Sequence, residues 1–327
     1  MNHPIYENKK NWRKRILNIC LPLIFIVLIG CTAVDEDSDL ADERMQEFVK
    51  NISAYARTFN PNFIIIPQNG AELAFNNADP ENELNTDYLQ FIDGLGIEEL
   101  FYNGTLSIDT YRLSILRQLK DMKKIMVSEY VSDPAYIAEA QNRNYQEGFI
   151  CFVREPDNYH YTQIPTEIFQ SNPDNITHPS QAKNYLYLIS TDNFSTKQEM
   201  IDTIKATNYD IILIDLFFQG TELTPSDIAQ LKTKPGGQQR LVISYISIGS
   251  AEKFRYYWQP DWKQNHPSWI KKPYSGYDNE FWIEFWHSEW KNLIYGNDNS
   301  YIKKIINAGF DGAYLDNVEA YYFLYND

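Results

Sequence analysis

Short hydrophobic runs recur along the chain after residue 60, and polar turn residues follow each of them. Most of these runs are continuously apolar rather than alternating, as strands of a parallel sheet are when both of their faces are buried. The pattern predicts eight strands: Phe63–Pro67, Gly96–Tyr102, Lys124–Val131, Gly148–Val153, Tyr185–Ser190, Asp210–Leu216, Leu241–Ile248 and Phe310–Val318.

Helical patterns lie between the predicted strands. Before the first strand, apolar residues from Met45 to Phe59 recur at intervals of three and four, which is the spacing of one face of a helix. Asp133-Pro134 and Thr224-Pro225 each pair an N-cap residue with proline at the first helical position. The chain is therefore predicted to be an α/β protein.

Eight strands that alternate with helices form either an open, doubly wound sheet or a closed barrel. No glycine-rich phosphate-binding loop follows any predicted strand, whereas acidic and polar residues gather at the C-terminal ends of the strands. TIM-type barrels place their active sites at this end of the strands. We therefore predict a single (β/α)8 TIM-type barrel over residues 45–327.

The first thirty residues have the pattern of an export signal. Five basic residues precede an apolar run over residues 16–29, which is short for a membrane span, and Gly30-Cys31 follows it. A small residue before a cysteine is typical of a bacterial lipoprotein signal peptide, after whose removal the thiol carries lipid. We expect residues 1–30 to be such a signal and Cys31 to be lipidated. An uncleaved membrane anchor with an incidental cysteine is the alternative.

Residues 31–44 are acidic and lack apolar periodicity, which predicts a solvated tether. This run resembles the signal that sends some bacterial lipoproteins to the outer surface, although a plain spacer has the same pattern. The chain has 29 Lys and Arg against 44 Asp and Glu, and a net charge of −15. Since residues 1–30 contribute a net charge of +4, the rest of the chain is near −19.

This charge argues against a nucleic-acid partner, because nucleic-acid-binding surfaces are basic. We expect a monomer in the bacterial cell envelope whose only contact with the membrane is the Cys31 lipid.

Carboxylates stand near the ends of three predicted strands. Asp316 lies near the end of the last strand, Glu98 and Glu99 lie in the second, and Asp215 lies in the sixth. A carboxylate in an apolar strand is costly to bury, so it is either tied to a neighbouring donor or used in chemistry. Two carboxylates across a sugar suffice for glycoside hydrolysis. Glu129, in the third strand, is a weaker candidate.

Six of the seven tryptophans gather between the last two predicted strands. Three have helical spacing, which favours a core stripe: Trp282, Trp286 and Trp290. The others lie in an irregular stretch, where their rings either stack on sugars or hold the loop to the barrel: Trp258, Trp262 and Trp269. The histidines show no metal-ligand spacing, and no Gly-x-Ser-x-Gly motif occurs. We expect no metal and no other cofactor.

Two long motifs carry a family resemblance. The first is Leu241–Glu252 (LVISYISIGSAE), followed by Arg255 and Trp258, and the second is Gly309–Tyr321 (GFDGAYLDNVEAY). Together they resemble the endo-α-1,4-polygalactosaminidase family, glycoside hydrolase family 114, and its uncharacterised relatives. The resemblance implies a β/α barrel with a catalytic aspartate and a catalytic glutamate.

The order of these motifs differs from that of the family, where they belong to the first half of the domain. Here they come last, and residues 45–69 and Ile92–Tyr102 resemble the family's fifth and sixth strands. The resemblance therefore implies a circular permutation, with family strands five to eight before strands one to four and a new joint around Ser180–Asn184. A closed barrel tolerates relocated ends in exposed loops. A rearranged gene with mismatched halves is the alternative.

By resemblance, Asp316 corresponds to the family's catalytic aspartate and Glu98 to its glutamate. We expect Asp316 to act as nucleophile or transition-state stabiliser and Glu98 as general acid/base. Glu99, which alternation turns to the opposite face, is the rival of Glu98. Ser250 stands where relatives often have Glu, and Glu319 replaces a usual Asp, so the substrate can differ. Further substrate-binding residues are expected: Asn69, Asp215, Tyr245, Glu252, Arg255, Trp258 and Asn317.

The expected function is that of a lipid-anchored, endo-acting glycoside hydrolase. Its expected substrate is a polysaccharide that contains amino sugars, such as α-1,4-polygalactosamine. A non-catalytic glycan-binding lipoprotein on the same barrel is the alternative, and its binding would survive replacement of Asp316 and Glu98. The sequence predicts neither the sugar linkage nor whether hydrolysis retains or inverts the anomeric configuration.

Overall fold

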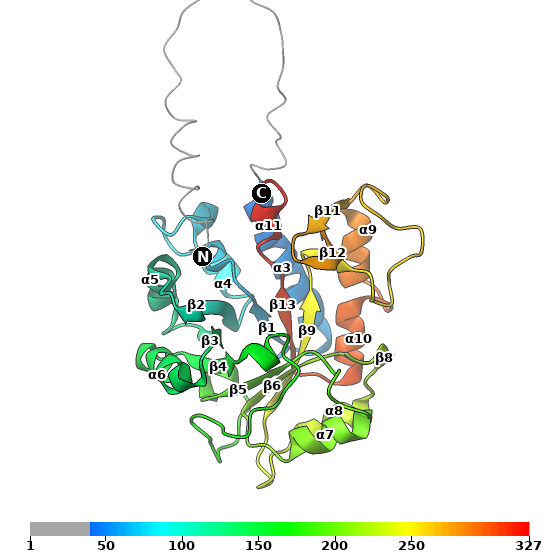
Figure 1. Cartoon of the computed structure of the whole chain (residues 1–327). Coiled ribbons are helices and arrows are strands. Elements are labelled where there is room, and N and C mark those ends of the chain that lie inside the picture. The colour runs from blue at the N-terminus through cyan, green and yellow to red at the C-terminus, as the bar shows by residue number, and fades with distance from the viewer. Residues whose placement is uncertain (1–39, 327) are drawn as a thin grey trace, which may run out of the picture.

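Parallel strands form the centre of the molecule, and helices cover them (Figure 1). The computed structural model describes residues 40–326. The larger sheet has the spatial order β1 (Ile64–Pro67), β13 (Gly312–Asp316), β9 (Leu241–Ser247), β6 (Ile211–Asp215) and β5 (Tyr185–Leu188). The smaller sheet has the order β2 (Gly94–Leu106), β3 (Lys124–Val131) and β4 (Ile150–Arg154). Neighbouring strands in both sheets are parallel. Each predicted strand overlaps one of these eight, and the predicted α/β class is confirmed.

The two parallel sheets are neighbours at both edges. At one edge, Gln68 directly after β1 forms a parallel bridge with Gly96 of β2. At the other edge, the ring of Phe152 in β4 packs against two rings of β5. Its centroid lies 5.9 Å from that of Tyr185 and 6.4 Å from that of Tyr187.

Antiparallel strands and helices complete the described part of the chain. The antiparallel sheet has the order β10 (Ser250–Glu252), β12 (Tyr277–Ile283) and β11 (Ile270–Tyr274), and β7 (Phe217–Phe218) pairs with β8 (Thr221–Glu222). The α-helices are α3 (Ala41–Phe59), α4 (Thr86–Leu89), α5 (Thr110–Leu119), α6 (Ile137–Glu147), α7 (Lys197–Lys205), α8 (Pro225–Leu231), α9 (Ser288–Ile294), α10 (Tyr301–Ala308) and α11 (Ala320–Phe323). Short 3-10 helices are η1 (Ala71–Ala74), η2 (Asn76–Ala78), η3 (Pro134–Tyr136), η4 (Pro156–Asn158) and η5 (Pro179–Gln181).

Both predicted helix starts are found. Thr224 caps α8 by accepting the Asp227 N–H at 3.3 Å, with Pro225 as the first helical residue. Asp133 accepts the Ala135 N–H at 3.0 Å at the start of η3, which leads directly into α6. In both cases the side-chain oxygen satisfies a backbone donor that the helix itself leaves free.

The first described helix, α3, packs on the strands through one apolar face. Met45, Phe48 and Ile52 are fully buried on this face, and each such side chain contributes about 1.5–3 kcal/mol. The helix begins at Ala41, so the tether predicted over residues 31–44 is too long at its C-terminal end. The predicted signal peptide and the lipid site Cys31 lie outside the described residues.

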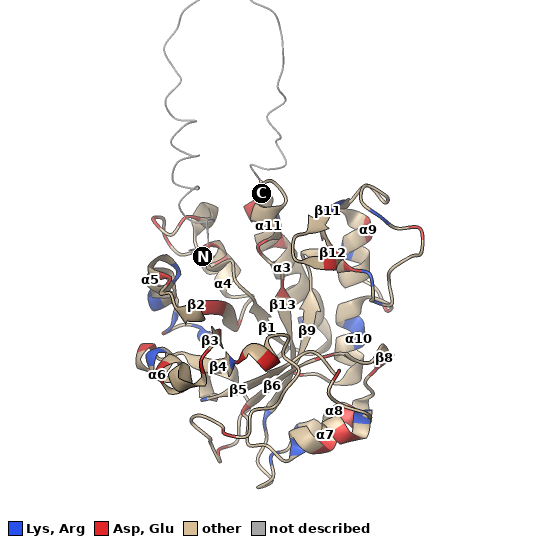
Figure 2. Ribbon diagram, in the orientation of Figure 1, with Lys and Arg blue, Asp and Glu red and all other residues tan. Residues whose placement is uncertain are grey.

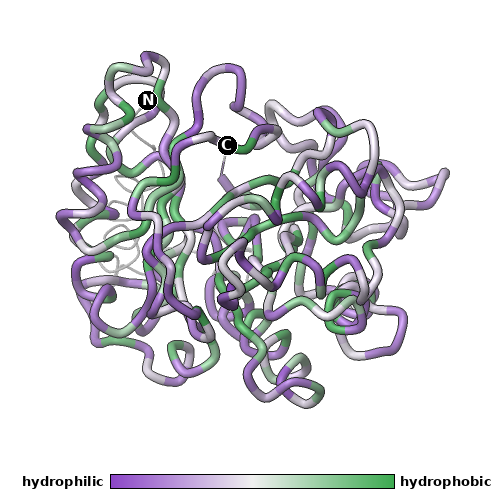
Figure 3. The backbone as a smooth tube through the Cα atoms, turned by 90° about the horizontal axis from the view of Figure 1, so that it is seen from below, coloured by the Kyte–Doolittle hydropathy of each residue, from purple (hydrophilic) through white to green (hydrophobic). Residues whose placement is uncertain are grey.

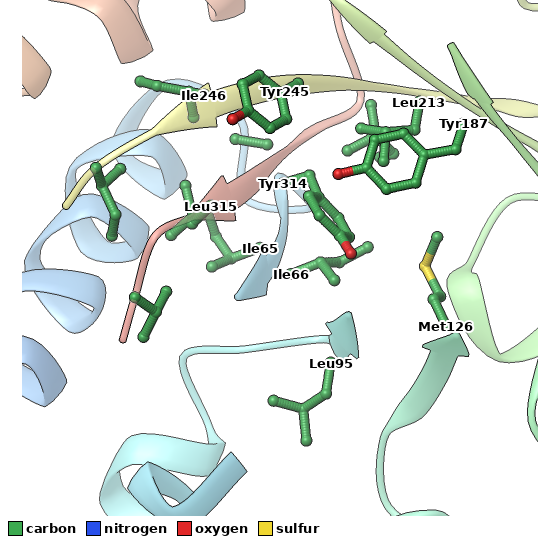
Figure 4. Packing of buried hydrophobic residues seen from close by; sticks show 14 of the residues in the cluster. Ile65, Ile66, Leu95, Met126, Tyr187, Leu213, Tyr245, Ile246, Tyr314 and Leu315 are labelled. Carbon is green, nitrogen blue, oxygen red and sulfur yellow. The ribbon is translucent and has the colours of Figure 1, made fainter. Parts of the chain in front are cut away.

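Aromatic and aliphatic side chains fill the space between the parallel strands. Figure 4 shows Ile66, Met126, Tyr187 and Tyr314 pointing toward one another. Gly96 makes room for this layer, because a Cβ atom built there would lie 1.9 Å from the Tyr314 hydroxyl. Figure 3 shows hydrophobic segments running through the interior and hydrophilic segments along many outer loops.

The two ends of the described chain lie side by side. Helix α11 adjoins α3 in Figure 1, where both lie on the same side of the molecule. The guanidinium carbon of Arg44 lies 4.6 Å from the ring centroid of Trp286, and the ring of Tyr325 stacks on the same indole at 6.4 Å. Within residues 40–326, no helix is long and apolar enough to cross a membrane.

Candidate active site

A cavity of 380 Å³ opens at the C-terminal ends of the parallel strands. Its acidic lining comes from both halves of the chain, and Figure 2 shows acidic residues on β2 and at the end of β13. Parallel α/β folds place ligand sites at this end of their strands, where the loops meet. The carboxylates that line the cavity are Glu98, Glu99, Asp215, Glu252, Glu280, Asp316 and Glu319, and the guanidinium groups are those of Arg112, Arg154 and Arg255.

Asp316 is the last residue of β13 and is held by two donors. The Tyr245 hydroxyl donates to Oδ2 at 2.5 Å, and the Asn317 N–H donates to Oδ1 at 2.7 Å. Burial, followed by the negative charge of Glu98, raises the pKa of Asp316 to about 7. Asp316 and Glu98 are therefore close enough to interact through space, although 218 positions separate them in the sequence.

Glu98 lies in β2 and is reached by a hydroxyl from the loop after β4. The Tyr161 hydroxyl donates to Oε1 at 2.5 Å and lies 3.0 Å from Oγ of Ser128. A guanidinium nitrogen of Arg154 lies 3.9 Å from the same carboxylate. The Asn69 side-chain oxygen accepts the Glu98 N–H at 3.3 Å, so Asn69 fixes the backbone that carries this carboxylate.

Glu99 lines the same cavity and is tied to Arg154 at 2.7 Å. The expectation that alternation turns it to the opposite face is wrong. Glu99 has a positive φ of 55°, and the register of β2 with β3 shifts directly after Glu98. The local left-handed conformation breaks the two-residue period on which the expectation rested. The short ion pair with Arg154 makes the Glu99 carboxylate less available for contact with a ligand than that of Glu98, which lies 3.9 Å from the same guanidinium.

Glu129, in the neighbouring strand β3, binds the irregular part of β2 between Glu98 and Asn103. It is fully buried, accepts the N–H groups of Phe101 at 3.1 Å and Tyr102 at 3.0 Å, and accepts the Asn144 side-chain amide at 2.9 Å. Burial raises the pKa of Glu129 to about 7. Glu129 is not part of the cavity lining, so the structure gives it a role in positioning β2 and not in substrate contact.

Arg255 forms ion pairs with two predicted site residues of the cavity lining, Asp215 and Glu252. Its guanidinium donates to Asp215 at 2.7 Å and to Glu252 at 2.6 Å, and all three side chains are buried. Burial acts to lower the pKa of Arg255, but the charges of Asp215 and Glu252 outweigh it and keep the cation charged. The sequence prediction that these three residues belong to the site is consistent with the cavity lining.

Two further carboxyl groups of the cavity lining have raised pKa values. Burial, followed by the charge of Glu252, raises the pKa of Glu280 to about 8. Burial also raises the pKa of Glu319 to about 8. Asn69 donates to Glu319 at 3.0 Å, and the Ser250 hydroxyl donates to Glu280 at 3.0 Å. Relatives often have a glutamate at position 250; here that position is a serine, and the carboxyl group beside it is that of Glu280.

Asn317 supports the end of β13. Its side-chain amide donates to Ser247 Oγ at 2.9 Å and to Ser250 Oγ at 3.0 Å. The amide therefore fixes the turn that directly follows Asp316.

Trp258, predicted to bind substrate, is not among the residues that line the cavity. Its ring stacks on Phe281 with centroids 5.7 Å apart and meets Trp262 edge-on at 5.5 Å. The predicted helical stripe of tryptophans is also wrong, because Trp282 lies in β12 and Trp290 lies in α9. Both are buried all the same.

Tyr245, which was predicted, lines the cavity, and further aromatic side chains of the lining come from segments that the sequence reasoning passed over. Tyr159 and Tyr161 follow β4, and Tyr274 and Tyr277 flank the turn between β11 and β12. The signal for the first pair was present, since both residues closely follow the C-terminal end of a predicted strand. Among residues 40–326, no group of three or more His, Cys, Asp or Glu side chains has an arrangement that would hold a metal ion.

A parallel α/β fold whose strand ends enclose a carboxylate-rich cavity is an arrangement that glycoside hydrolases use. The model of glycoside-hydrolase family GH114 matches residues 165–327, which include β9, β13 and Asp316. Through these residues the chain belongs to glycoside-hydrolase family GH114.

Three relatives are themselves uncharacterised proteins. The chain is 35% identical over 153 residues to the uncharacterised protein MJ1477 of Methanocaldococcus jannaschii, which is 46% of this chain and 41% of that protein. It is 27% identical over 118 residues to an uncharacterised protein of Thermotoga maritima and 27% identical over 124 residues to one of Deinococcus radiodurans. These matches cover 36 and 38% of this chain and 35 and 38% of those proteins. The chain thus spans well under half the length of these relatives.

Proposed function

We propose that the protein hydrolyses a polysaccharide containing amino sugars, with Asp316 and Glu98 as the catalytic pair. The observation that carries the proposal is the meeting of these two carboxylates in one cavity at the strand ends. Membership of family GH114 supports a glycoside hydrolase. The sugar, the two residue roles and endo-action are parts of the proposal.

The charge of the cavity supports a cationic sugar. Its lining has seven carboxyl groups against three guanidinium groups, and each guanidinium already has a carboxylate partner within 3 Å. A protonated amine on the sugar would find acceptors there without displacing an existing cation. It would also favour ionisation of the carboxyls whose pKa burial raises.

The two carboxyls divide the work. The Tyr245 hydroxyl and the Asn317 N–H donate to Asp316 and would stabilise it as an anion, and Glu98 takes the part of the acid. In the first step, Asp316 bonds to the anomeric carbon or stabilises its positive charge. The bond to the leaving oxygen breaks, and Glu98 gives that oxygen its proton. Water then adds to the anomeric carbon, any bond between Asp316 and that carbon breaks so that Asp316 leaves as a carboxylate, and Glu98 takes the proton that the water loses.

The test is the release of reducing ends from α-1,4-linked galactosamine polymer by the purified protein. Asp316→Asn and Glu98→Gln should each lower the rate by at least about a thousandfold while leaving the thermal transition nearly unchanged. An oligosaccharide with a nitrophenyl leaving group, which departs without a proton, separates the roles. Glu98→Gln should keep much of its bond-cleaving rate on this substrate, and Asp316→Asn should not.

A protein that binds galactosamine oligomers and cleaves none, with affinity that survives both substitutions, would instead be a glycan-binding protein.

We also propose that the two parallel sheets form one closed eight-stranded barrel entered at a permuted position. Three features support closure: the bridge between Gln68 and Gly96, the packing of Phe152 on β5, and the parallel pairing of the last strand with the first. The family match is confined to the second half of the chain. This is compatible with a permutation that moves the family's first strands to the end.

The lipid anchor at Cys31 stays a proposal that rests on the pattern of residues 1–31. Cells that express the full chain should incorporate labelled palmitate into the protein, and Cys31→Ser should lose the label. Labelling of the Cys31→Ser protein would contradict the proposal.

A further inference from the structure

The two carboxyl groups of the proposed catalytic pair differ in how their oxygens are bound. Asp316 accepts at both oxygens, from the Tyr245 hydroxyl at 2.5 Å and from the Asn317 N–H at 2.7 Å. Glu98 accepts at one oxygen only, because the Tyr161 hydroxyl donates to Oε1 at 2.5 Å and no donor in the described part of the chain reaches Oε2. Oε2 is therefore the Glu98 oxygen that is free to carry a proton and to give it away.

A chain of two hydrogen bonds runs from Ser128 through Tyr161 to Glu98. The Ser128 hydroxyl lies 3.0 Å from the Tyr161 hydroxyl, and both side chains are buried. Tyr161 has one hydroxyl hydrogen, so when it donates to Glu98 the Ser128 hydroxyl is the donor of the other bond. The reverse direction would leave the Ser128 hydrogen without an acceptor among the described residues, which is costly at a fully buried position. Tyr161 therefore directs its hydrogen at the Glu98 carboxyl.

The ring that carries this hydroxyl is fixed by its neighbours. It stacks on the ring of Tyr187 with centroids 3.9 Å apart, and the Arg154 guanidinium carbon lies 4.7 Å from the Tyr161 centroid. The Ser190 N–H, shortly after β5, donates to the Tyr161 carbonyl at 3.2 Å. The hydroxyl is thus oriented before any ligand binds, so the orientation costs no conformational entropy during the reaction.

The backbone at Tyr161 is unusual as well. Its φ of 55° lies in the left-handed region, which residues with a side chain rarely adopt. Strain of this kind gathers at functional sites in folded proteins, where the surrounding contacts maintain it. A glycine would relieve the strain at this position, but it would not supply the hydroxyl that reaches Glu98.

We propose that Tyr161, supported by Ser128, is a positioning residue for Glu98 that makes Oε2 the proton-donating oxygen. In the first step the O–H bond at Oε2 breaks, the leaving sugar oxygen gains the proton, and Glu98 is left as a carboxylate. Oε1 accepts from Tyr161 before and after this transfer, so the carboxyl group does not rotate. The inference rests on the proposed function and deepens it, because it identifies the groups that orient the acid.

The test compares two substrates of the full-length protein. One is α-1,4-linked galactosamine polymer, whose leaving oxygen needs a proton, and the other is a nitrophenyl galactosamine oligosaccharide, whose leaving group departs without one. Tyr161→Phe keeps the ring and removes only the hydroxyl. It should lower kcat on the polymer by about ten- to a hundredfold, as loss of a hydrogen bond to an ionisable group does, with KM nearly unchanged. Nitrophenolate release in the first turnover should fall by less than about threefold.

Two further variants complete the comparison, with all rates taken at equal folded concentration. Ser128→Ala removes the donor behind Tyr161 and should give the same pattern with a smaller loss, about three- to tenfold on the polymer. This variant carries the test if Tyr161→Phe does not fold. Tyr185→Phe is the matched control, because it removes the hydroxyl of another buried ring, outside the cavity lining, that has no hydrogen-bond partner within the described residues. Both of its rates should equal those of wild type.

Equal losses on the two substrates would mean that the substitution disturbs the whole cavity, and unchanged rates would mean that the hydroxyl is not needed. A selective loss on the polymer that Tyr185→Phe also shows would mean that the effect is not specific to Tyr161. Each of these results overturns the positioning role and keeps the hydrolase, since wild type still cleaves. Absence of cleavage of both substrates by wild type rejects the hydrolase and the positioning role with it.

Discussion

At the scale of single residues, the cavity is set by carboxyl groups that are buried close to one another. Burial raises the pKa of Asp316 to about 7 and that of Glu319 to about 8, and the charges of neighbouring carboxylates add to the effect. Ionisation of each group therefore lowers the free energy of unfolding. Carboxyl groups kept in such an environment are candidates for binding a cation or transferring a proton.

Glu319 gives the clearest consequence for stability. Its pKa is raised in the folded protein, so the stability it contributes is complete below about pH 4.5 and is lost as the pH rises through about 8. Glu319→Gln removes the ionisation and keeps an acceptor for Asn69. The variant should match wild type at pH 4 and exceed it by about 1–3 kcal/mol at pH 9 in denaturant unfolding. The exposed control Glu83→Gln should show no such pH dependence. A Glu319→Gln advantage that is largest at low pH would contradict the burial argument.

The sequence identified the residues whose position follows from the end of a strand. Asp316 and Asp215 were found because they lie near the C-terminal ends of predicted apolar strands, and both line the cavity. Glu280 was not found, because it lies in a polar-looking strand whose place over the cavity depends on its pairing with β10. The contact between Trp258 and Phe281 also depends on tertiary packing, in this case of the loop after β10. The local sequence pattern does not show whether the Trp258 ring faces the cavity or Phe281.

At the scale of elements, the irregular part of β2 decides which carboxylates reach the cavity. Glu99 adopts a left-handed conformation, and Glu129 binds the backbone N–H groups that follow it. The two-residue alternation of a regular strand predicts one glutamate in the cavity and one outside it. The structure has both in the cavity. No local sequence signal marks the break, because it is stabilised from the neighbouring strand β3.

Glu129→Ala therefore should affect both stability and activity. It leaves the N–H groups of Phe101 and Tyr102 and one N–H of the Asn144 side-chain amide without their acceptor, which costs about 2–5 kcal/mol. It should also lower the rate of glycan cleavage, since Glu98 lies just before the released segment. Urea unfolding measures the loss of stability, and the reducing-end assay measures the loss of cleavage rate. Measuring the rate and the glycan affinity on folded protein separates a displaced Glu98 from a smaller folded fraction. Asp202→Ala, which removes an exposed carboxylate of α7 that pairs with Lys205, should cost less than about 0.5 kcal/mol. An unchanged rate in folded Glu129→Ala protein would show that the irregularity does not position Glu98.

At the scale of the whole molecule, the eight predicted strands and their parallel pairing agree with the structure, because continuous apolar runs separated by helices leave few other arrangements. The lengths of the strands and the junctions between sheets were beyond prediction. Residues after β4 also follow a path that the sequence did not indicate. Lys234 crosses to Asp210 at 2.5 Å in the buried interior and binds the Asn172 carbonyl at 2.8 Å, which secures the stretch leading to β5.

The proximity of the chain ends makes the permutation testable. Arg44 and Tyr325 both contact the ring of Trp286, so a flexible linker of about ten Gly and Ser residues can join the ends. A rearranged chain of residues 167–326, this linker and residues 41–166 opens the exposed loop between Thr166 and Glu167. It should unfold cooperatively, within about 10 °C of the original chain. An insoluble or non-cooperative product would argue that the present order is required for the fold.

The central claim is that Asp316 and Glu98 together cleave a glycan chain rich in amino sugars. The most direct measurement is the rate of reducing-end release from α-1,4-linked galactosamine polymer by wild type, Asp316→Asn and Glu98→Gln at equal folded concentration. We predict release by wild type and a loss of at least about a thousandfold in each variant. Equal release by all three proteins, or no release by wild type from this polymer or from a broad panel of glycans, would contradict the claim.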